Sequence, residues 1–166
     1  GLALSRGAAG VVYFLHSSGA ERLPAAAGRV GQERVYEGLV TASGEPTPAY
    51  TAVRALNLRL RALSPVLAPL FYHGACASRS LPAGQPVRGV DGPVELALFG
   101  DRTQPTHLLV VNPSTRAAVQ TRLRLEAARV ADAVTDVPLP SAAGQVTLEL
   151  SPGNFALLHL EDDAGE

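Results

Sequence analysis

Residues that could carry out chemistry are few in this chain, and they do not cluster in the sequence. His73, His107 and His159 do not fall at the spacing of metal ligands, and Cys76 is the only cysteine. A zinc site needs several Cys or His ligands at short spacings, so no metal site is predicted. The sequence has no Gly-x-Ser-x-Gly motif and no glycine-rich phosphate loop, which argues against a serine hydrolase and a nucleotide-binding enzyme. It therefore predicts neither a metal ion nor a cofactor.

Carboxylates are better candidates for contacts with a ligand. Three glutamates lie in or beside a long polar stretch, residues 17–36: Glu21, Glu33 and Glu37. Carboxylate oxygens accept hydrogen bonds, so these side chains could bind the hydroxyl groups of a sugar. Glu37 is the best of the three because it comes just before the approach to a predicted helix. The alternative is that all three are solvated surface acids. They could pair with nearby arginines, but exposed ion pairs contribute little to the stability of the fold.

The first element that would position these residues is a helix that begins after residue 47. Thr47 is a good N-cap residue, because its hydroxyl can accept a hydrogen bond from the first turn, and Pro48 suits the first helical position. Apolar residues follow in steps of three and four: Val53, Leu56, Leu60, Leu63 and Leu67. This spacing predicts an amphipathic helix, which Pro65 and Pro69 are expected to kink or end.

The residues before this helix predict a helix end, a strand and a loop. Residues 1–6 are followed by Gly7, which fits a helix that ends with glycine at the C′ position. Residues 10–15 form a continuous apolar run, which favours a strand buried on both faces, as in a parallel sheet. Helix end, buried strand, long loop and helix is the order of the last βα unit of a (β/α)₈ barrel.

After residue 70 the pattern changes to short strands. They are predicted at residues 94–99, 106–111, 117–126, 130–137, 146–150 and 155–160. Turn sequences separate them, and the proline-rich residues 80–93 are expected to form a loop or an edge. Short strands at this spacing predict an antiparallel sandwich or barrel.

Composition limits the classes of protein to which the chain can belong. Its 166 residues suffice for one domain, or for a small domain and part of another. The net charge is −1 and neither sign is clustered, which argues against nucleic acid and membrane surfaces as partners. The chain begins with Gly1 and shows no signal-peptide pattern, so we expect it to be a piece of a longer protein.

Residues 38–57 also carry a recognisable motif. They read GLVTASGEPTPAYTAVRALN, which resembles the loop and last helix of the catalytic barrel in glycoside hydrolases of the β-galactosidase type. Several families of this type have an all-β domain after the barrel, with runs similar to residues 107–112, 119–125 and 146–160 here. The order of these motifs is what makes the resemblance specific.

The resemblance implies an α+β fragment of such an enzyme. Residues 1–70 would be the terminal strand, loop and helix of the TIM barrel, and residues 71–166 would be a C-terminal β-sandwich domain. The partners would be a carbohydrate and the rest of the barrel polypeptide. Homo-oligomers are a further expectation.

The resemblance implies contact with sugar but no catalysis by this chain. Glycoside hydrolysis needs two facing carboxyl groups, which these enzymes take from strands four and seven of the barrel, and neither can be placed on this sequence. Phe14 and His16 match the end of strand eight, where related enzymes often stack an aromatic residue, commonly Trp, on the sugar. This chain has no Trp. Phe14, His16 and Glu37 are therefore the candidate substrate-binding residues.

Other interpretations remain open. Phe14 could belong to a core, and His16 could be a loop residue without a ligand. The second part could be a stand-alone module that binds carbohydrate or a protein. Sugar-binding modules usually expose a row of aromatic side chains, whereas after residue 70 there are only four: Phe71, Tyr72, Phe99 and Phe155. The last interpretation is a purely structural, oligomer-forming domain.

Overall fold

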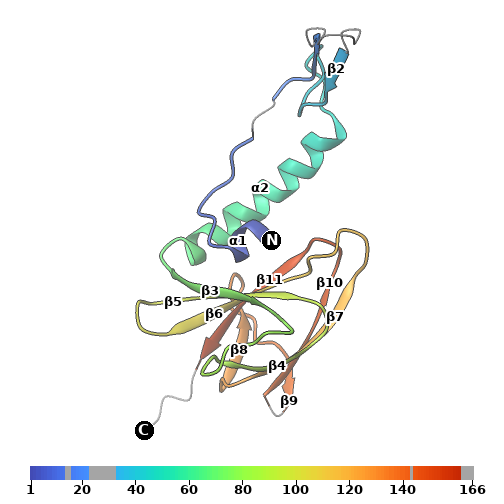
Figure 1. Cartoon of the computed structure of the whole chain (residues 1–166). Helices are drawn as coiled ribbons and strands as arrows, with labels where there is room; N and C mark the ends of the chain where they lie inside the picture. Colours follow the sequence, from blue (N-terminus) through green and yellow to red (C-terminus); the bar gives the residue numbers. More distant parts are fainter. Residues whose placement is uncertain (14–15, 23–32, 143, 162–166) are drawn as a thin grey trace, which may run out of the picture. The chain divides into compact units, whose positions relative to one another are not determined.

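The computed structural model describes residues 1–13, 16–22, 33–142 and 144–161 (Figure 1). The chain divides into two compact units, one made of residues 1–9 and 65–166 and the other of residues 10–64. The boundary predicted between residues 70 and 71 lies close to the second point of division. No helix among the described residues is both long and apolar enough to cross a membrane.

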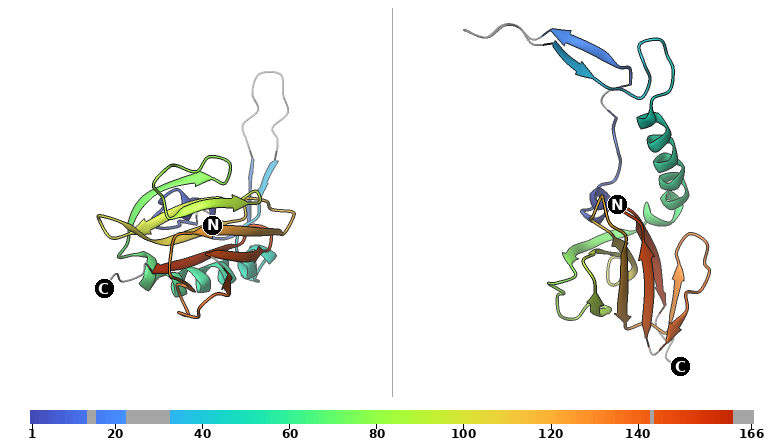
Figure 2. Two further views of the ribbon diagram at one scale, coloured as in Figure 1. Left: turned by 90° about the horizontal axis from the view of Figure 1, so that it is seen from below. Right: turned by 90° about the vertical axis from the view of Figure 1, so that its right-hand side faces the viewer.

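The larger unit contains two antiparallel sheets (Figures 1 and 2). The five-stranded sheet has the order β3 (Phe71–Ala77), β5 (Glu95–Gly100), β6 (Pro105–Val111), β11 (Phe155–Glu161) and β8 (Arg129–Asp132). The four-stranded sheet has the order β4 (Val87–Asp91), β7 (Val119–Leu125), β10 (Gln145–Leu150) and β9 (Ser141–Ala142).

One hydrophobic core joins the two sheets. Along β7 every second residue is buried and the residues between are exposed, which is the pattern of a strand with one face in a core. Buried residues of both sheets form a single cluster, which includes Leu96, Leu108 and Leu158 from the larger sheet and Leu123, Val146 and Leu150 from the smaller one. The two sheets therefore form a β-sandwich.

The five-stranded sheet is also buried on its other face. Leu108 belongs to the core between the sheets, and the next residue, Leu109, points the opposite way, yet both are 0% exposed. The short helix α1 (Leu2–Ser5) contacts β5 and β6. Gly1 lies so close to Val111 and Phe155 that a Cβ atom there would be 2.7 Å from the Val111 side chain. Residues 1–9 thus cover part of this second face.

The helix end predicted at Gly7 is confirmed. Helix α1 stops at Ser5, and Gly7 has a φ of 79°, which glycine adopts without strain. The N–H groups of Gly7 and Ala8 donate to helix carbonyls at 3.0 Å each, in the pattern of a Schellman motif. The Tyr72 ring packs over Gly7, and its hydroxyl donates to the Ser5 carbonyl at 3.2 Å.

The smaller unit contains a hairpin and most of a long helix. Strands β1 (Gly19–Arg22) and β2 (Glu33–Tyr36) pair antiparallel, so the ends of the stretch expected to be a loop form strands. Helix α2 (Pro48–Leu67) begins at Pro48 as predicted and continues through Pro65. Leu63 is the only buried residue of α2, and in the rest of the predicted apolar stripe Leu56 is exposed and the others are half-buried.

The last βα unit of a TIM barrel, predicted for residues 1–70, is wrong. Residues 11–13 form no strand, and Val12 is 94% exposed; residues 14 and 15 lie outside the described residues. All strands of the described chain pair antiparallel, whereas a barrel needs parallel strands. Among the described residues there are eleven strands and two helices, so the chain is mostly β rather than an α+β fragment. An apolar run without a neighbouring strand cannot build a sheet.

The strands predicted after residue 70 are mostly confirmed, and the edge expected within residues 80–93 is β4, an edge strand of the smaller sheet. Strands β3 and β9 were not predicted. The strand predicted over residues 130–137 ends at Asp132, because the Asp132 carboxylate accepts hydrogen bonds from the N–H groups of Val134 and Thr135 and closes a turn there.

Asn112 ties the two sheets together at one end of the sandwich. It follows β6 and is completely buried. Its Nδ2 atom donates to the carbonyl of Leu150, at the end of β10, at 3.0 Å, and to those of Ala117 and Ser151 at 2.8 and 3.1 Å. Its Oδ1 atom accepts from the Ser114 N–H at 2.9 Å. Such a buried network needs both a donor and an acceptor on one side chain.

We expect Asn112→Asp to lower the free energy of unfolding by about 3 kcal/mol or more at pH 7, since a carboxylate would face three carbonyl oxygens and donate to none. Urea denaturation measures the loss. Gln145→Glu, which adds the same charge on the exposed face of β10 opposite Arg124, should not lower stability. The deficit of Asn112→Asp should shrink near pH 4, where a protonated carboxyl can donate. Equal stability of the two variants at pH 7 would contradict the proposed role of Asn112.

Candidate functional site

The motif in residues 38–57 folds into a loop that is fixed by close backbone packing. Gly38 is buried, and a Cβ atom there would lie 2.5 Å from the carbonyl carbon of Ser17. Its N–H donates to the Ser18 hydroxyl at 3.0 Å. Only glycine allows the two backbones to approach this closely.

Further hydrogen bonds connect the start of α2 to this loop. The Thr47 hydroxyl lies 2.8 Å from the Gly38 carbonyl and 3.0 Å from the Leu39 carbonyl, and it donates to them. The Thr47 N–H donates to the Leu39 carbonyl at 3.0 Å. Thr47 was expected to accept a bond from the first helical turn; here its hydroxyl is a donor that holds the loop against the helix start. Gly44, with a φ of 89°, closes the turn between these segments.

The same loop positions His16. Residues 16–18 and 38–40 lie side by side, with the Val40 N–H donating to the His16 carbonyl at 2.9 Å and the Ser18 N–H to the Val40 carbonyl at 2.7 Å. Residue 16 is thereby held close to the first turns of α2.

A groove of about 370 Å³ lies between this segment and α2. Its lining residues all belong to the smaller unit: Tyr13, His16, Leu39, Tyr50, Val53, Arg54, Asn57, Leu58 and Arg61. The Tyr13 hydroxyl donates to Oδ1 of Asn57 at 2.8 Å, which fixes both side chains. Tyr13 and Tyr50 are 38% and 39% exposed, so each offers ring surface to a ligand.

No protein-family model matches this chain, and neither does any curated protein or any solved structure. The chemistry of the groove therefore has to be inferred from its side chains. The tyrosine rings and three aliphatic side chains supply apolar surface, and an amide, two guanidinium groups and an imidazole supply hydrogen bonds. No Asp or Glu is among the described residues that line it. The side chains suit a ligand, but the lining residues that the structure describes include no pair of carboxyl groups for acid–base catalysis.

The three residues predicted to contact substrate differ in their position relative to the groove. His16 is exposed and lines the groove, with Nδ1 at 3.4 Å from the Ser17 hydroxyl. Glu37 is exposed and does not line it, since it lies between β2 and Gly38. Phe14 lies outside the described residues.

Of the residues that line the groove, only His16 was predicted from the sequence, although the sequence contains one pattern that indicates others on α2. The lining residues of α2 include a polar series at helical spacing: Tyr50, Arg54, Asn57 and Arg61. Steps of four, three and four place them on one face of the helix. That face is polar, so a search for apolar periodicity does not find it.

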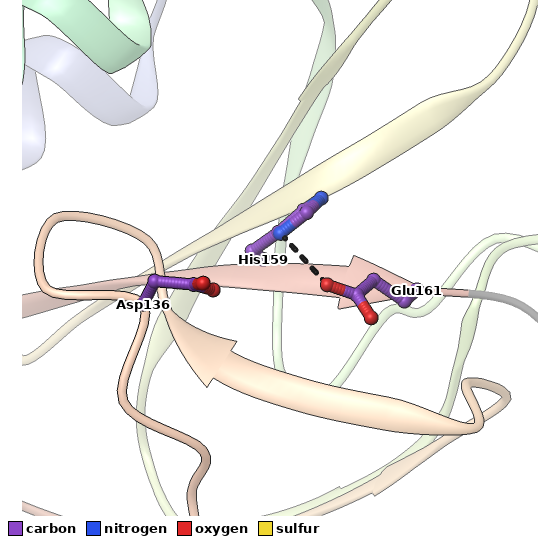
Figure 3. A group of neighbouring side chains, drawn as sticks. All are labelled: Asp136, His159 and Glu161. Atoms are coloured by element: carbon purple, nitrogen blue, oxygen red, sulfur yellow. Dashed lines mark ion pairs between the residues drawn. The ribbon is translucent and has the colours of Figure 1, made fainter.

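A second group of titratable side chains lies on the sandwich (Figure 3). Asp136, His159 and Glu161 each offer a ligand atom, and these atoms lie within 4.8 Å of one another. The two carboxylates already share a cation, because Arg129 forms ion pairs with both Asp136, at 3.1 Å, and Glu161. The hydrogen bond with Asp136 and the two negative charges raise the pKa of Arg129 further above its ordinary value. This group is an arginine-centred ion-pair cluster rather than a metal centre.

Two imidazoles stack beside this cluster. The rings of His107 and His159 lie 4.7 Å apart at 19°, and His159 Nδ1 is 3.5 Å from a Glu161 oxygen. Burial, and secondly the electrostatic effect of the neighbouring His159 ring, lowers the pKa of His107 to about 4. His107 therefore stays neutral in the folded chain at pH values where a free imidazole is protonated.

We predict that His107 makes the sandwich less stable in mild acid. The unfolded chain binds a proton at His107 near pH 6.5 and the folded chain only near pH 4. Stability from this group is complete above about pH 6.5 and is lost as the pH falls toward 4. Because the ring is only half-buried and solvent screens its charge, the loss is about 1–2 kcal/mol, less than the full shift would give. Urea denaturation from pH 7 to pH 4 measures this loss. His107→Gln should flatten the profile and His73→Gln, at an exposed position, should not; identical profiles for both variants would contradict the prediction.

We also predict that Gly38→Ala disrupts the groove. The added methyl group would clash with the backbone of residues 16–18, so the hydrogen bonds of Val40 and Thr47 should weaken. Hydrogen exchange of these amides should become at least about tenfold faster, which corresponds to about 1.4 kcal/mol. Gly19→Ala is the matched control, because a Cβ atom there meets nothing within 4 Å. Unchanged exchange in Gly38→Ala would show that the close approach is not essential.

Proposed function

We propose that the groove of residues 10–64 binds carbohydrate and that this chain is a non-catalytic part of a β-galactosidase-like glycoside hydrolase. The sequence of residues 38–57 resembles a segment of those enzymes, and the same residues build the loop and helix that line the groove.

The side chains of the groove suit a sugar. Sugar rings present apolar C–H faces that pack on aromatic rings, and hydroxyl groups at their edges that need planar donors and acceptors. Tyr13, Tyr50 and Asn57 offer this combination within one groove, and the hydrogen bond from Tyr13 to Asn57 orders two of them before any ligand binds. This arrangement is the single observation that carries the proposal.

Hydrolysis by this groove alone is not part of the proposal. A retaining enzyme needs two carboxyl groups about 5–5.5 Å apart, and an inverting enzyme about 6.5–9.5 Å apart. Since no carboxylate is found among the described lining residues, a separate catalytic domain would have to supply both acids. The role of this chain would be to hold the sugar.

A sugar site on the sandwich is the alternative, and it has less support. Of the four aromatic residues after position 70, Phe99 and Phe155 are buried. Tyr72 packs over Gly7 and against Phe99, and the Arg102 guanidinium lies 4.6 Å from the centre of the Phe71 ring. These rings do not form a free platform.

We predict that galactose-containing oligosaccharides bind the full chain and that Tyr50→Ala weakens this binding at least about tenfold, or about 1.4 kcal/mol, because the ring contact is lost. Isothermal titration calorimetry measures the affinity. Phe71→Ala, which removes an equally exposed aromatic ring from the sandwich, should leave it unchanged.

The opposite result would favour the alternative. If Phe71→Ala weakened binding and Tyr50→Ala did not, the sugar site would lie on the sandwich. If none of the oligosaccharides bound to the unaltered chain, the carbohydrate proposal would fail.

A further inference from the structure

The charge of the groove narrows the class of sugar. Arg54 and Arg61 both line it, together with His16, and none of the described lining residues is acidic. Within the described part of the chain, neither arginine takes part in an ion pair, in contrast to Arg129, which binds two carboxylates. The guanidinium groups in the groove are thus available to a ligand.

The spacing of Arg54 and Arg61 indicates how an acidic ligand could be bound. They are seven residues apart on α2, which places them two turns apart on the same face, about 10 Å along the helix axis. A guanidinium group binds a carboxylate through two parallel hydrogen bonds, a geometry that a neutral hydroxyl does not reproduce. Tyr50 and Asn57 lie on the same helical face, so a sugar ring and an acid group can be bound side by side.

We infer that the groove recognises an acidic saccharide, in which carboxylate groups on successive rings pair with Arg54 and Arg61 while the tyrosines pack against the rings. This inference rests on the proposed carbohydrate function and adds the substrate class. The apolar side chains Leu39, Val53 and Leu58 provide the remaining contact surface for the rings. Because the site is open to solvent, its charge interactions are sensitive to salt.

The test compares saccharides that differ only in charge. Calorimetric titrations of the full chain use trigalacturonic acid and its fully methyl-esterified form, at 50 mM and 500 mM sodium chloride. We expect the acid to bind at least tenfold more tightly than the ester at low salt and the difference to shrink at high salt. Arg54→Gln and Arg61→Gln should each reduce the preference for the acid over the ester at least threefold, because the affinity for the acid falls more than the affinity for the ester. Arg79→Gln, the same charge change at an exposed position of the sandwich, should have no effect.

The possible failures are distinct. Equal affinities for acid and ester, with no effect of the arginine variants, would overturn this inference and leave the carbohydrate proposal intact. No binding of either saccharide, or of galactose-containing oligosaccharides, would overturn both. A tetraglutamate peptide serves as the probe for a protein partner, and binding as tight as that of trigalacturonic acid would overturn the inference, because the groove would then select charge and not sugar.

Discussion

The larger unit depends on one constraint, which is that the central strands of its five-stranded sheet are apolar on both faces. Leu108 and Leu109 are neighbours in β6, point in opposite directions and are both fully buried. One face is covered by the four-stranded sheet, and the other is partly covered by residues 1–9 through α1 and Gly1. This requirement explains why the first nine residues belong to the sandwich although 55 residues separate them from its next segment. The burial of apolar area on two faces stabilises the unit, and the Schellman motif and the Asn112 network satisfy the polar groups that this burial removes from water.

The outcome of the sequence predictions follows from the same constraint. Strands with one buried face, such as β7 and β10, alternate and were predicted close to their observed bounds. A continuous apolar run was correctly associated with a strand buried on both faces, but the rule was applied to residues 10–15. It describes residues 108–111 of β6, which are buried on both faces and whose neighbours β5 and β11 provide pairing on both sides. The composition of a segment shows that it can be buried. Which other segments cover it depends on the tertiary structure and cannot be seen in the segment itself. For that reason β3, which has mostly exposed and half-buried residues, was not predicted.

In the groove, too, features that depend on neighbouring residues in the sequence were predicted, and features that depend on tertiary contacts were not. The helix start at Pro48 was predicted correctly, because the preference for proline at the first helical position acts within a few residues. The role of Gly38 was not predicted, since its need for glycine comes from the backbone of residues 16–18, twenty positions away. Likewise, nothing in the sequence around Tyr13 indicates that its hydroxyl bonds to Asn57. His16 was named as a candidate from a resemblance and lines the groove, whereas Glu37, chosen from its place in the sequence alone, does not.

The two faces of α2 explain why a binding groove can lie where sequence analysis expected only a packing helix. The predicted apolar stripe and the polar series from Tyr50 to Arg61 occupy adjacent faces, and Val53 belongs to both because it is part of the stripe and lines the groove. A helix in a barrel would bury the stripe, yet here only Leu63 is buried. With so little of the helix in a core, the groove depends on local connections, namely the Thr47 and Gly38 contacts and the bond from Tyr13 to Asn57. These connections use backbone groups, the hydroxyl groups of Thr47 and Ser18, and the hydroxyl of Tyr13 with the amide of Asn57. The guanidinium and tyrosine side chains therefore remain available for a ligand, and the geometry of the groove can be tested separately from its chemistry.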